Sequence, residues 1–282
     1  MLKQRVITAL VLLAILLPAL FYPSYVPFCA IALVLISAGG WEWGRLNGCS
    51  QPLSVLLGVA CLSACLLSWY AGLLTQSLPW LWVAVGAIWV LAGAWLLRSG
   101  VNGWPQIARS LRLIVGAVAI WLAWLALAQA RVIGVNFLLS IMVLVWVADI
   151  GAYFSGKAFG GRFIKTKLAA AISPGKSWEG VCGGMFCVLV LALGWVLLDR
   201  SGATNSPSLY SSLVSRHGWL VMLIAVIFLS AMSVVGDLVE SLVKRSAGAK
   251  DSSALLPGHG GVLDRVDALL PALPLAMMLA SL

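Results

Sequence analysis

Charged side chains are scarce in this sequence of 282 residues, and their scarcity excludes an ordinary soluble protein. Only 10% of the residues are Asp, Glu, Lys or Arg, whereas soluble domains carry about 25%. Apolar residues make up 62% of the chain, and the mean hydropathy is +1.04. The composition therefore predicts an integral membrane protein.

CxxC pairs and a recognisable leader cleavage site are also missing. The six cysteines form no CxxC pair and no cluster with histidine, which argues against a zinc centre or a thiol redox centre. Cys61 and Cys65 lie one helical turn apart, and we interpret the cysteines as buried thiols that pack as small apolar groups. The basic and apolar N-terminal stretch has no small-residue cleavage site before Tyr22, so we expect an uncleaved first helix.

Long apolar runs fill most of the chain. Nine are close to the roughly 20 residues that a helix needs to cross a bilayer, and they fall at about 6–22, 25–40, 53–72, 78–97, 110–130, 132–155, 178–198, 218–238 and 266–282. The boundary between the fifth and sixth runs is weakly marked, because only Arg131 separates them. Twenty-eight glycines and fourteen tryptophans suit close helix packing and anchoring at the lipid interface. We predict an all-α polytopic membrane protein, a bundle of about nine transmembrane helices.

Basic residues favour one side of this predicted bundle. With nine spans, the N-terminus and the loops after the even-numbered spans carry fifteen of the eighteen basic residues, and the other side carries only Arg131, Arg200 and Arg216. Because cytoplasmic loops are enriched in Lys and Arg, we expect the N-terminus in the cytoplasm and the C-terminus outside. The net charge of +9 suits lipid headgroups or nucleotides as partners, not nucleic acid.

Acidic residues are confined almost entirely to the second half of the chain. Only Glu42 precedes residue 149, and the other eight follow from Asp149 onward. Carboxylates at membrane depth are costly and usually mark functional sites. We therefore predict that residues 1–140 form scaffold helices and that residues 141–282 form the catalytic region, within one membrane domain.

The first polar segment covers residues 149–180. Asp149 lies in or at the end of an apolar run, and glycines and lysines that suit an anion follow it. Ser173 and Pro174 are expected to begin the next helix, whose N-terminus would bind phosphate beside Lys176. The alternative is a basic cytoplasmic loop that only touches lipid phosphates.

The second polar segment ends the eighth apolar run. On a helix, Asp237, Ser241 and Lys244 share one face, with Glu240 beside them. Such a stripe suits a cation held by carboxylates and a phosphate held by the lysine. The alternative is a helix end that emerges into water with ordinary ion pairs.

The third polar segment comes just before the last apolar run. A turn rich in Gly and Pro surrounds His259 and could wrap a ligand. Asp264 and Asp267 could face one Mg²⁺, which prefers oxygen ligands, while Lys250 and Arg265 could hold phosphates. Together the segments contain the parts of phosphoryl or nucleotidyl transfer. A transporter would instead spread polar residues through several spans and across both faces.

The stretch from Ser241 to Asp267 resembles the signature of the phosphatidate cytidylyltransferases, or CDP-diacylglycerol synthases. The match runs through Ser241-x-Val243-Lys244-Arg245, Lys250-Asp251 and Leu256-Pro257-x-His259-Gly260-Gly261-Val262-x-Asp264-Arg265-Val266-Asp267. The segments 149–153 and 173–180, the length and the number of spans are similar as well, whereas the first half is similar only in hydropathy. Gly175 stands where many relatives have a second basic residue.

This resemblance implies a nucleotidyltransferase of phospholipid biosynthesis. CTP and phosphatidate would give CDP-diacylglycerol and pyrophosphate with Mg²⁺, and the resemblance leaves open a second, monovalent cation and a homodimer. The enzyme would lie in the inner membrane of a bacterium among membrane lipids, with its active site facing the cytoplasm. Because the signature does not specify the lipid, a related transferase or kinase that acts on an isoprenoid or ether lipid is the alternative. No residue is identified that reads the cytosine base.

The resemblance also assigns roles to residues of this sequence. The divalent metal would be held by Asp237, Asp264 and Asp267. The catalytic residues would be Asp237, Lys244, Lys250, His259, Asp264 and Arg265. The residues that contact the nucleotide or the headgroup would be Asp149, Ser173, Lys176, Ser177, Arg245, Gly260 and Gly261.

Overall fold

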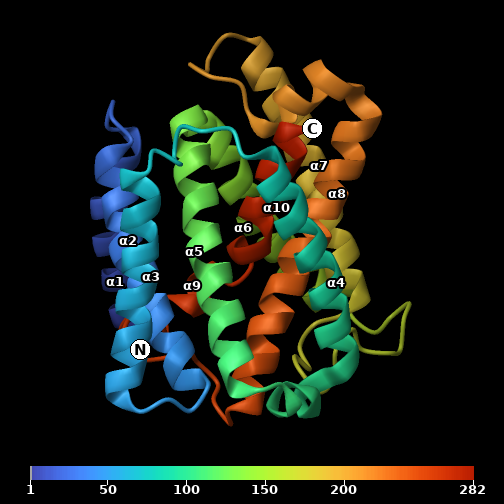
Figure 1. The fold of residues 1–282 in the computed structure, drawn as a ribbon. Coiled ribbons are helices and arrows are strands. Elements are labelled where there is room, and N and C mark those ends of the chain that lie inside the picture. The colour runs from blue at the N-terminus through green and yellow to red at the C-terminus, as the bar shows by residue number, and fades with distance from the viewer. Residues whose placement is uncertain (1) are drawn as a thin grey trace.

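The computed structural model describes residues 2–282, and its regular structure is helical (Figure 1). The helices are α1 (Leu2–Phe21), α2 (Val26–Leu46), α3 (Gln51–Tyr70), α4 (Pro79–Gly103), α5 (Arg109–Ile133), α6 (Val135–Phe159), α7 (Trp178–Arg200), α8 (Leu209–Ser246), α9 (Leu263–Val266) and α10 (Leu269–Ser281). Extended backbone within residues 2–282 pairs only in a single bridge between Leu256 and Gly260. The predicted all-α class is confirmed.

Eight helices, α1 to α8, are long and apolar enough to cross a membrane. The weakly marked boundary lies at Gly134, between α5 and α6. Arg131 is buried in the last turn of α5, where its guanidinium donates to the carbonyl of Tyr22 at 2.6 Å. The ninth predicted span, 266–282, is shorter than expected, because its helix is the thirteen-residue α10, while the four-residue α9 ends where the span was predicted to begin.

Two of the long helices are bent at glycines with left-handed backbone. Gly100 in α4 has φ of 67°, and Gly218 in α8 has φ of 84°. Glycine adopts such angles without a steric penalty. The bend at Gly218 separates a short first part of α8 from the apolar run that was predicted to begin there.

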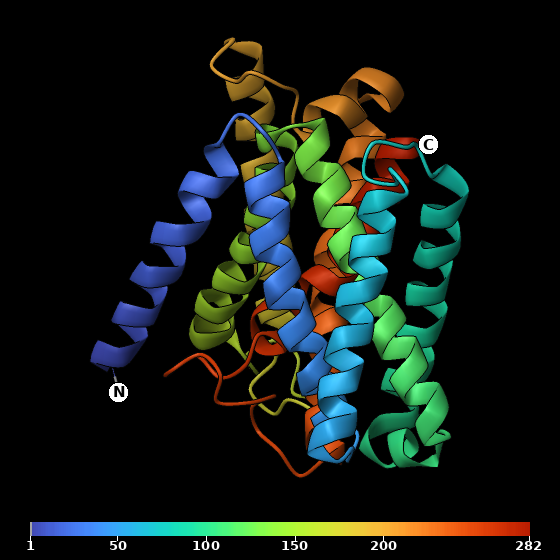
Figure 2. The same cartoon turned by 60° about the vertical axis from the view of Figure 1, so that its left-hand side comes forward.

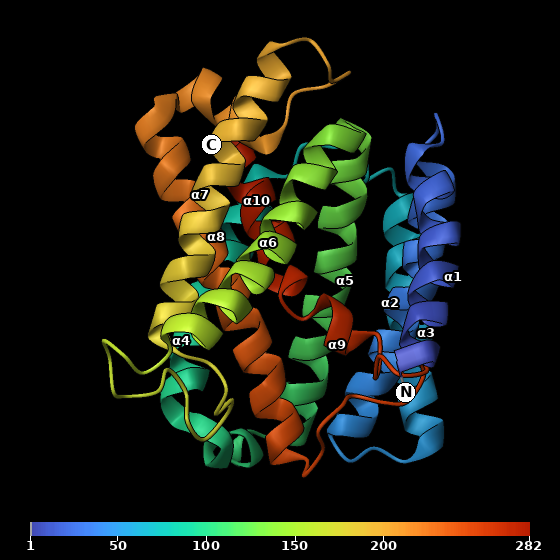
Figure 3. The same cartoon turned by 180° about the vertical axis from the view of Figure 1, so that it is seen from behind.

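The short helix α10 occupies the centre of the bundle. It packs against α4, α5, α6 and α8, and Figures 1 and 3 show it enclosed by longer helices. Its residues from Leu269 to Met277 are all buried. A helix that is apolar on every side is stable only in such surroundings, so α10 forms the core around which the longer helices assemble.

The two termini lie at opposite ends of the bundle (Figure 2). The N-terminus shares its end with the loops that follow α2, α4, α6 and α8 (Figures 1 and 3). Together with the N-terminal end of α1, these loops and the adjoining helix ends hold fifteen of the eighteen basic residues. The fold therefore gathers the positive charge at one end, as the alternation of spans predicts.

Glycines allow α6 and α7 to approach each other closely. A Cβ added to Gly184 would lie 2.5 Å from the carbonyl oxygen of Ala148, and one added to Gly180 would lie 2.8 Å from that of Ala152. These neighbours are backbone atoms, which cannot rotate away. Small residues at helix contacts are a principal source of association between membrane helices.

We expect Gly184→Ala to destabilise the protein, because its methyl group would force α6 and α7 apart. Overpacking costs about 1–3 kcal/mol, which corresponds to a melting temperature lower by about 2–12 °C. Gly194→Ala in the same helix is the matched control, since nothing lies within 4 Å of its added Cβ. The measurement is the thermal unfolding of both variants in detergent, and equal melting temperatures would contradict the proposed contact.

Candidate active site

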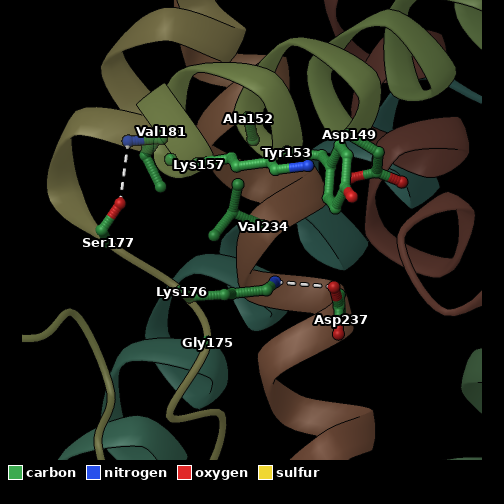
Figure 4. Close-up of a pocket in the computed structure, with 12 residues that line it drawn as sticks. Asp149, Ala152, Tyr153, Lys157, Gly175, Lys176, Ser177, Val181, Val234 and Asp237 are labelled. Carbon is green, nitrogen blue, oxygen red and sulfur yellow. Dashed lines mark hydrogen bonds and ion pairs between the residues drawn. The ribbon is translucent and has the colours of Figure 1, made fainter. Parts of the chain in front are cut away.

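A cavity of about 510 Å³ lies between α6, the start of α7 and α8 (Figure 4). Its charged side chains come from three separate parts of the sequence. The residues that line it are Asp149, Ala152, Tyr153, Gly156, Lys157, Gly175, Lys176, Ser177, Gly180, Val181, Val234 and Asp237. The fold thus joins the first polar segment to the second, and it places four of the predicted site residues in one cavity.

Asp237 and Lys176 form an ion pair across this cavity. The Lys176 ammonium lies 2.6 Å from the Asp237 carboxylate, and the two side chains are 23% and 29% exposed. The Ser241 hydroxyl donates to the other oxygen of Asp237 at 3.2 Å, so the predicted shared face of α8 is confirmed for this pair. In Figure 4, Asp149 and Lys157 lie on α6 above the ion pair, and the Lys157 side chain extends toward Tyr153 and Asp149. Two carboxylates and two ammonium groups therefore surround a space that substrates can enter.

The start of α7 differs from the sequence prediction. Ser173 and Pro174 lie in a turn, and the helix begins at Trp178 with Ser177 as its N-cap. The Ser177 hydroxyl accepts the N–H of Gly180 at 3.1 Å, which satisfies one of the free donors at the helix end. The prediction that the helix starts at Ser173 and Pro174 was wrong by four residues. Ser177 and the first turn of α7 nevertheless line the cavity.

Glu179 orders the long loop between α6 and α7. Its carboxylate accepts the backbone N–H groups of Phe163 and Ile164 at 3.1 and 2.9 Å. Lys167 closes the other part of the loop by donating to the carbonyl of Pro174 at 2.6 Å. This loop carries the basic residues that precede Lys176, so these bonds restrict where their charges can lie.

Asp264 is the centre of the third polar segment. One carboxylate oxygen accepts the Lys244 ammonium at 2.6 Å, and the other accepts the N–H and hydroxyl of Ser252 and the N–H of Gly261, each at 2.8 Å. Burial alone would raise the pKa of Asp264, but the Lys244 ammonium and the two N–H groups outweigh it and leave this pKa below its usual range. Asp264 is therefore held as a carboxylate.

Lys244 is a buried lysine between two carboxylates. It pairs with Asp264 and also with Glu240, one turn earlier in α8. Glu240 is only 3% exposed, and its oxygens have no hydrogen-bond partner besides this ion pair within residues 2–282. A charge at this depth needs a partner, so Lys244 compensates two acids at once. Glu240 was noted in the sequence only as a neighbour of the stripe.

Asp267 lies just before α10, in the interior of the bundle. Its carboxylate accepts the N–H of Ala268 at 2.7 Å. Asp267 lies close enough to the Asp237 and Asp149 carboxylates, which line the cavity, for the three acids to influence one another electrostatically.

Glu42 is a residue of this region that the predicted site residues do not include. It belongs to α2 and is completely buried, and its carboxylate accepts four hydrogen bonds from residues 252–263. The sequence contains one feature that could have identified it: Glu42 is the only acidic residue before Asp149. An acid alone in an apolar helix needs donors from elsewhere.

The remaining predicted residues lie around the third segment. Arg245, Lys250 and Arg265 are exposed, and His259 is half-buried with an Nδ1 atom that has no partner within residues 2–282. Gly260 has φ of 81°, and a Cβ there would lie 2.7 Å from the Asp264 carboxylate. The glycine is therefore required for the close turn around that acid.

No three His, Cys, Asp or Glu side chains converge at metal-binding distances in residues 2–282. Asp237 and Asp264 each pair with a lysine, and Asp267 pairs with its neighbouring N–H. Mg²⁺ at nucleotide sites usually takes one or two carboxylates together with phosphate oxygens and water, so the residues fit such an ion. In both lysine pairs the ammonium group occupies a position beside the carboxylate that a metal cation could take in its place.

Comparison with known proteins identifies the family. The model of the cytidylyltransferase family matches residues 3–282. The chain is 40% identical to the phosphatidate cytidylyltransferase of Pseudomonas aeruginosa, over 97% of this chain and 95% of that protein. It is 36% identical to the enzymes of the same name from Haemophilus influenzae and Brucella melitensis, covering 97% and 100% of this chain and 96% and 94% of theirs. With a match along almost its whole length, and with carboxylates and lysines gathered in one cavity, the chain belongs to the cytidylyltransferase family.

Proposed function

We propose that this chain is a phosphatidate cytidylyltransferase of phospholipid biosynthesis. An oxygen of the phosphatidate phosphate attacks the α-phosphorus of CTP, the bond from that phosphorus to the bridging oxygen breaks, and pyrophosphate leaves. The observation that carries this proposal is the cavity in which Asp237 and Lys176 face Asp149 and Lys157. It supplies acids for a cation and ammonium groups for phosphates at the end of the bundle where basic residues gather.

Phosphates bring negative charge that the lysines of the cavity can neutralise. Lys176 and Lys157 are at least partly exposed in the cavity, so they are free to contact phosphate oxygens. The free N–H groups at the start of α7 add an anion-binding end to the same space. Lys244 of α8 forms ion pairs with Glu240 of the same helix and with Asp264, and the second of these pairs holds the third polar segment against α8. These residues bind and orient the substrates, and most of the catalysis of phosphoryl transfer is such positioning.

Mg²⁺ is the cofactor in this proposal, with Asp237 and Asp264 as its ligands and Asp267 nearby. When bound, it would neutralise charge on the phosphates. Asp237 and Asp264 support the assignment because each has an oxygen whose partner is a lysine. Substrate phosphates would compete for the ammonium of Lys176 and so release the Asp237 carboxylate.

The membrane orientation follows from the distribution of charge. We place the end with the N-terminus and the basic loops in the cytoplasm, where CTP is found, and the protein in a bacterial inner membrane. Residues 141–282 supply the lining of the cavity, which supports their role as the catalytic region. Residues 1–140 act as scaffold.

The test is a direct assay on purified protein with labelled CTP, phosphatidate and Mg²⁺. We expect labelled CDP-diacylglycerol and one pyrophosphate per product. Polyprenol phosphate and an ether-linked phosphatidate analogue in parallel reactions test the choice of lipid. If a well-folded preparation forms no lipid-linked cytidylyl product from phosphatidate, the proposal is wrong.

A further inference from the structure

Glu42 connects the scaffold half of the chain to the loop of the signature. Ser253 donates to one oxygen at 2.6 Å and Ser252 donates to the other at 3.2 Å. The backbone N–H groups of Val262 and Leu263 donate at 2.9 and 2.7 Å. All four bonds are accepted by the carboxylate, as suits an ionised acid, and within residues 2–282 no Lys or Arg forms an ion pair with it.

Ser252 links Glu42 to Asp264. Its single hydroxyl proton is shared between the Glu42 carboxylate, at 3.2 Å, and the Asp264 carboxylate, at 2.8 Å. Gly261 donates to Asp264, while the next two N–H groups donate to Glu42. The two acids therefore accept consecutive N–H groups of the same short segment, so a shift of that segment would disturb the bonds to both.

The space between these groups is tight. A Cβ on Gly261 would lie 2.1 Å from the Ser252 hydroxyl and 2.3 Å from the Glu42 carboxylate. Glycine is therefore the residue that fits between the two acids. The close fit indicates that the loop is built around the Glu42 carboxylate, since burial of an acid without such donors is strongly unfavourable.

We infer that Glu42 is a positioning residue for the active site. It holds residues 252–263 so that Asp264 and, through it, Lys244 face the substrates. Glu42 itself lies behind the loop and does not line the cavity. The inference rests on the proposed function for its kinetic consequence, whereas the ordering of the loop can be measured without any substrate.

The experiment compares Glu42→Gln with the wild type in the purified full chain. Glutamine keeps the shape but offers only one acceptor oxygen, so donors of the loop are left without partners. We expect kcat to fall about 10- to 100-fold, as is typical when a supporting residue of a site is lost, with a much smaller change in KM for phosphatidate. Hydrogen exchange at residues 255–263 should accelerate. Glu42→Asp, which keeps the carboxylate, should recover part of kcat.

Gln129→Ala is the matched control for a general loss of stability. Gln129 is also buried in the scaffold half, and it makes three hydrogen bonds, to Trp82 and to the carbonyls of Leu73 and Gln76. These contacts lie toward the other end of the bundle, so the variant should unfold more easily while its kcat stays within about twofold and exchange at 255–263 is unchanged. A loss of kcat in Gln129→Ala equal to that in Glu42→Gln would overturn the inference.

Coupling to Ser252 separates positioning from a structural role. If Glu42 acts through Ser252, then Ser252→Ala should lower kcat in the wild type and have much less effect in Glu42→Gln. Fully additive effects, or a Glu42→Gln enzyme with normal kcat and normal exchange, would refute the inference. Should Glu42→Gln fail to fold, Ser253→Ala removes one of the four bonds to Glu42 together with the bond that the hydroxyl accepts from the N–H of Leu255, and normal kcat together with normal exchange there would refute it equally. A wild type without activity would refute the proposed function instead, and the exchange measurement would still decide the role of Glu42.

Discussion

Asp237→Asn should abolish nearly all activity while leaving the protein folded. The Asp237 side chain lies in the cavity with an exposed fraction of 29% and pairs with Lys176. Because the Lys176 side chain is also partly exposed, removal of the carboxylate does not leave a buried lysine charge without a partner. A metal-held transition-state charge is worth several kcal/mol, and each 1.36 kcal/mol is a factor of ten. We therefore expect kcat to fall about 10²- to 10⁴-fold, measured as CDP-diacylglycerol formed under saturating CTP and phosphatidate. A kcat within tenfold of the wild type would remove Asp237 from the metal site.

Asp199→Asn is the control at the other end of the bundle. Asp199 accepts hydrogen bonds from Asn136, Thr204, Ser208 and Ser211, and through them it fixes the loop before α8. Its replacement should lower the melting temperature and leave kcat of the folded protein within about twofold. The two aspartates should therefore show opposite effects on activity and stability.

Asp264→Asn should damage both activity and stability. The carboxylate is almost fully buried and accepts the Lys244 ammonium together with three further donors. Removing one partner of a buried ion pair costs about 3–5 kcal/mol, which corresponds to a melting temperature lower by about 6–20 °C. We expect kcat to fall at least about 100-fold. Thermal unfolding and turnover of the same preparation test both effects, and a variant that melts like the wild type would contradict the central position of Asp264 in its loop.

The spans could be predicted from the sequence because hydropathy is read locally. An apolar run of 20 residues near a bilayer has one stable form, a helix that satisfies its own backbone groups. The start of α7 was missed because Ser173 and Pro174 carry the same local signal as Ser177. In the structure, the carbonyl of Ser173 accepts the N–H of Lys176 at 3.2 Å. Ser173 and Pro174 therefore form a turn before the helix and do not begin the helix itself.

The partners of the site residues could be predicted only in part. Asp237 and Ser241 share one helix, so their spacing was enough. Glu42 and Ser252 are 210 positions apart, and no periodicity connects them. The lysine partners of Asp237 and Asp264 could not be predicted either, because several lysines lie in the same region of the sequence and only the fold determines which of them pairs with each acid.

The length of α10 bears on where the substrates would meet. Its thirteen residues rise about 20 Å, whereas the hydrocarbon layer of a bilayer is about 30 Å thick. The helix is therefore about 10 Å too short to cross such a layer by itself. Under the proposed function, this shortfall would let Asp267, which directly precedes α10, lie below the surface of the bilayer, so that the lipid headgroup and the nucleotide would both have to enter the bundle to reach it.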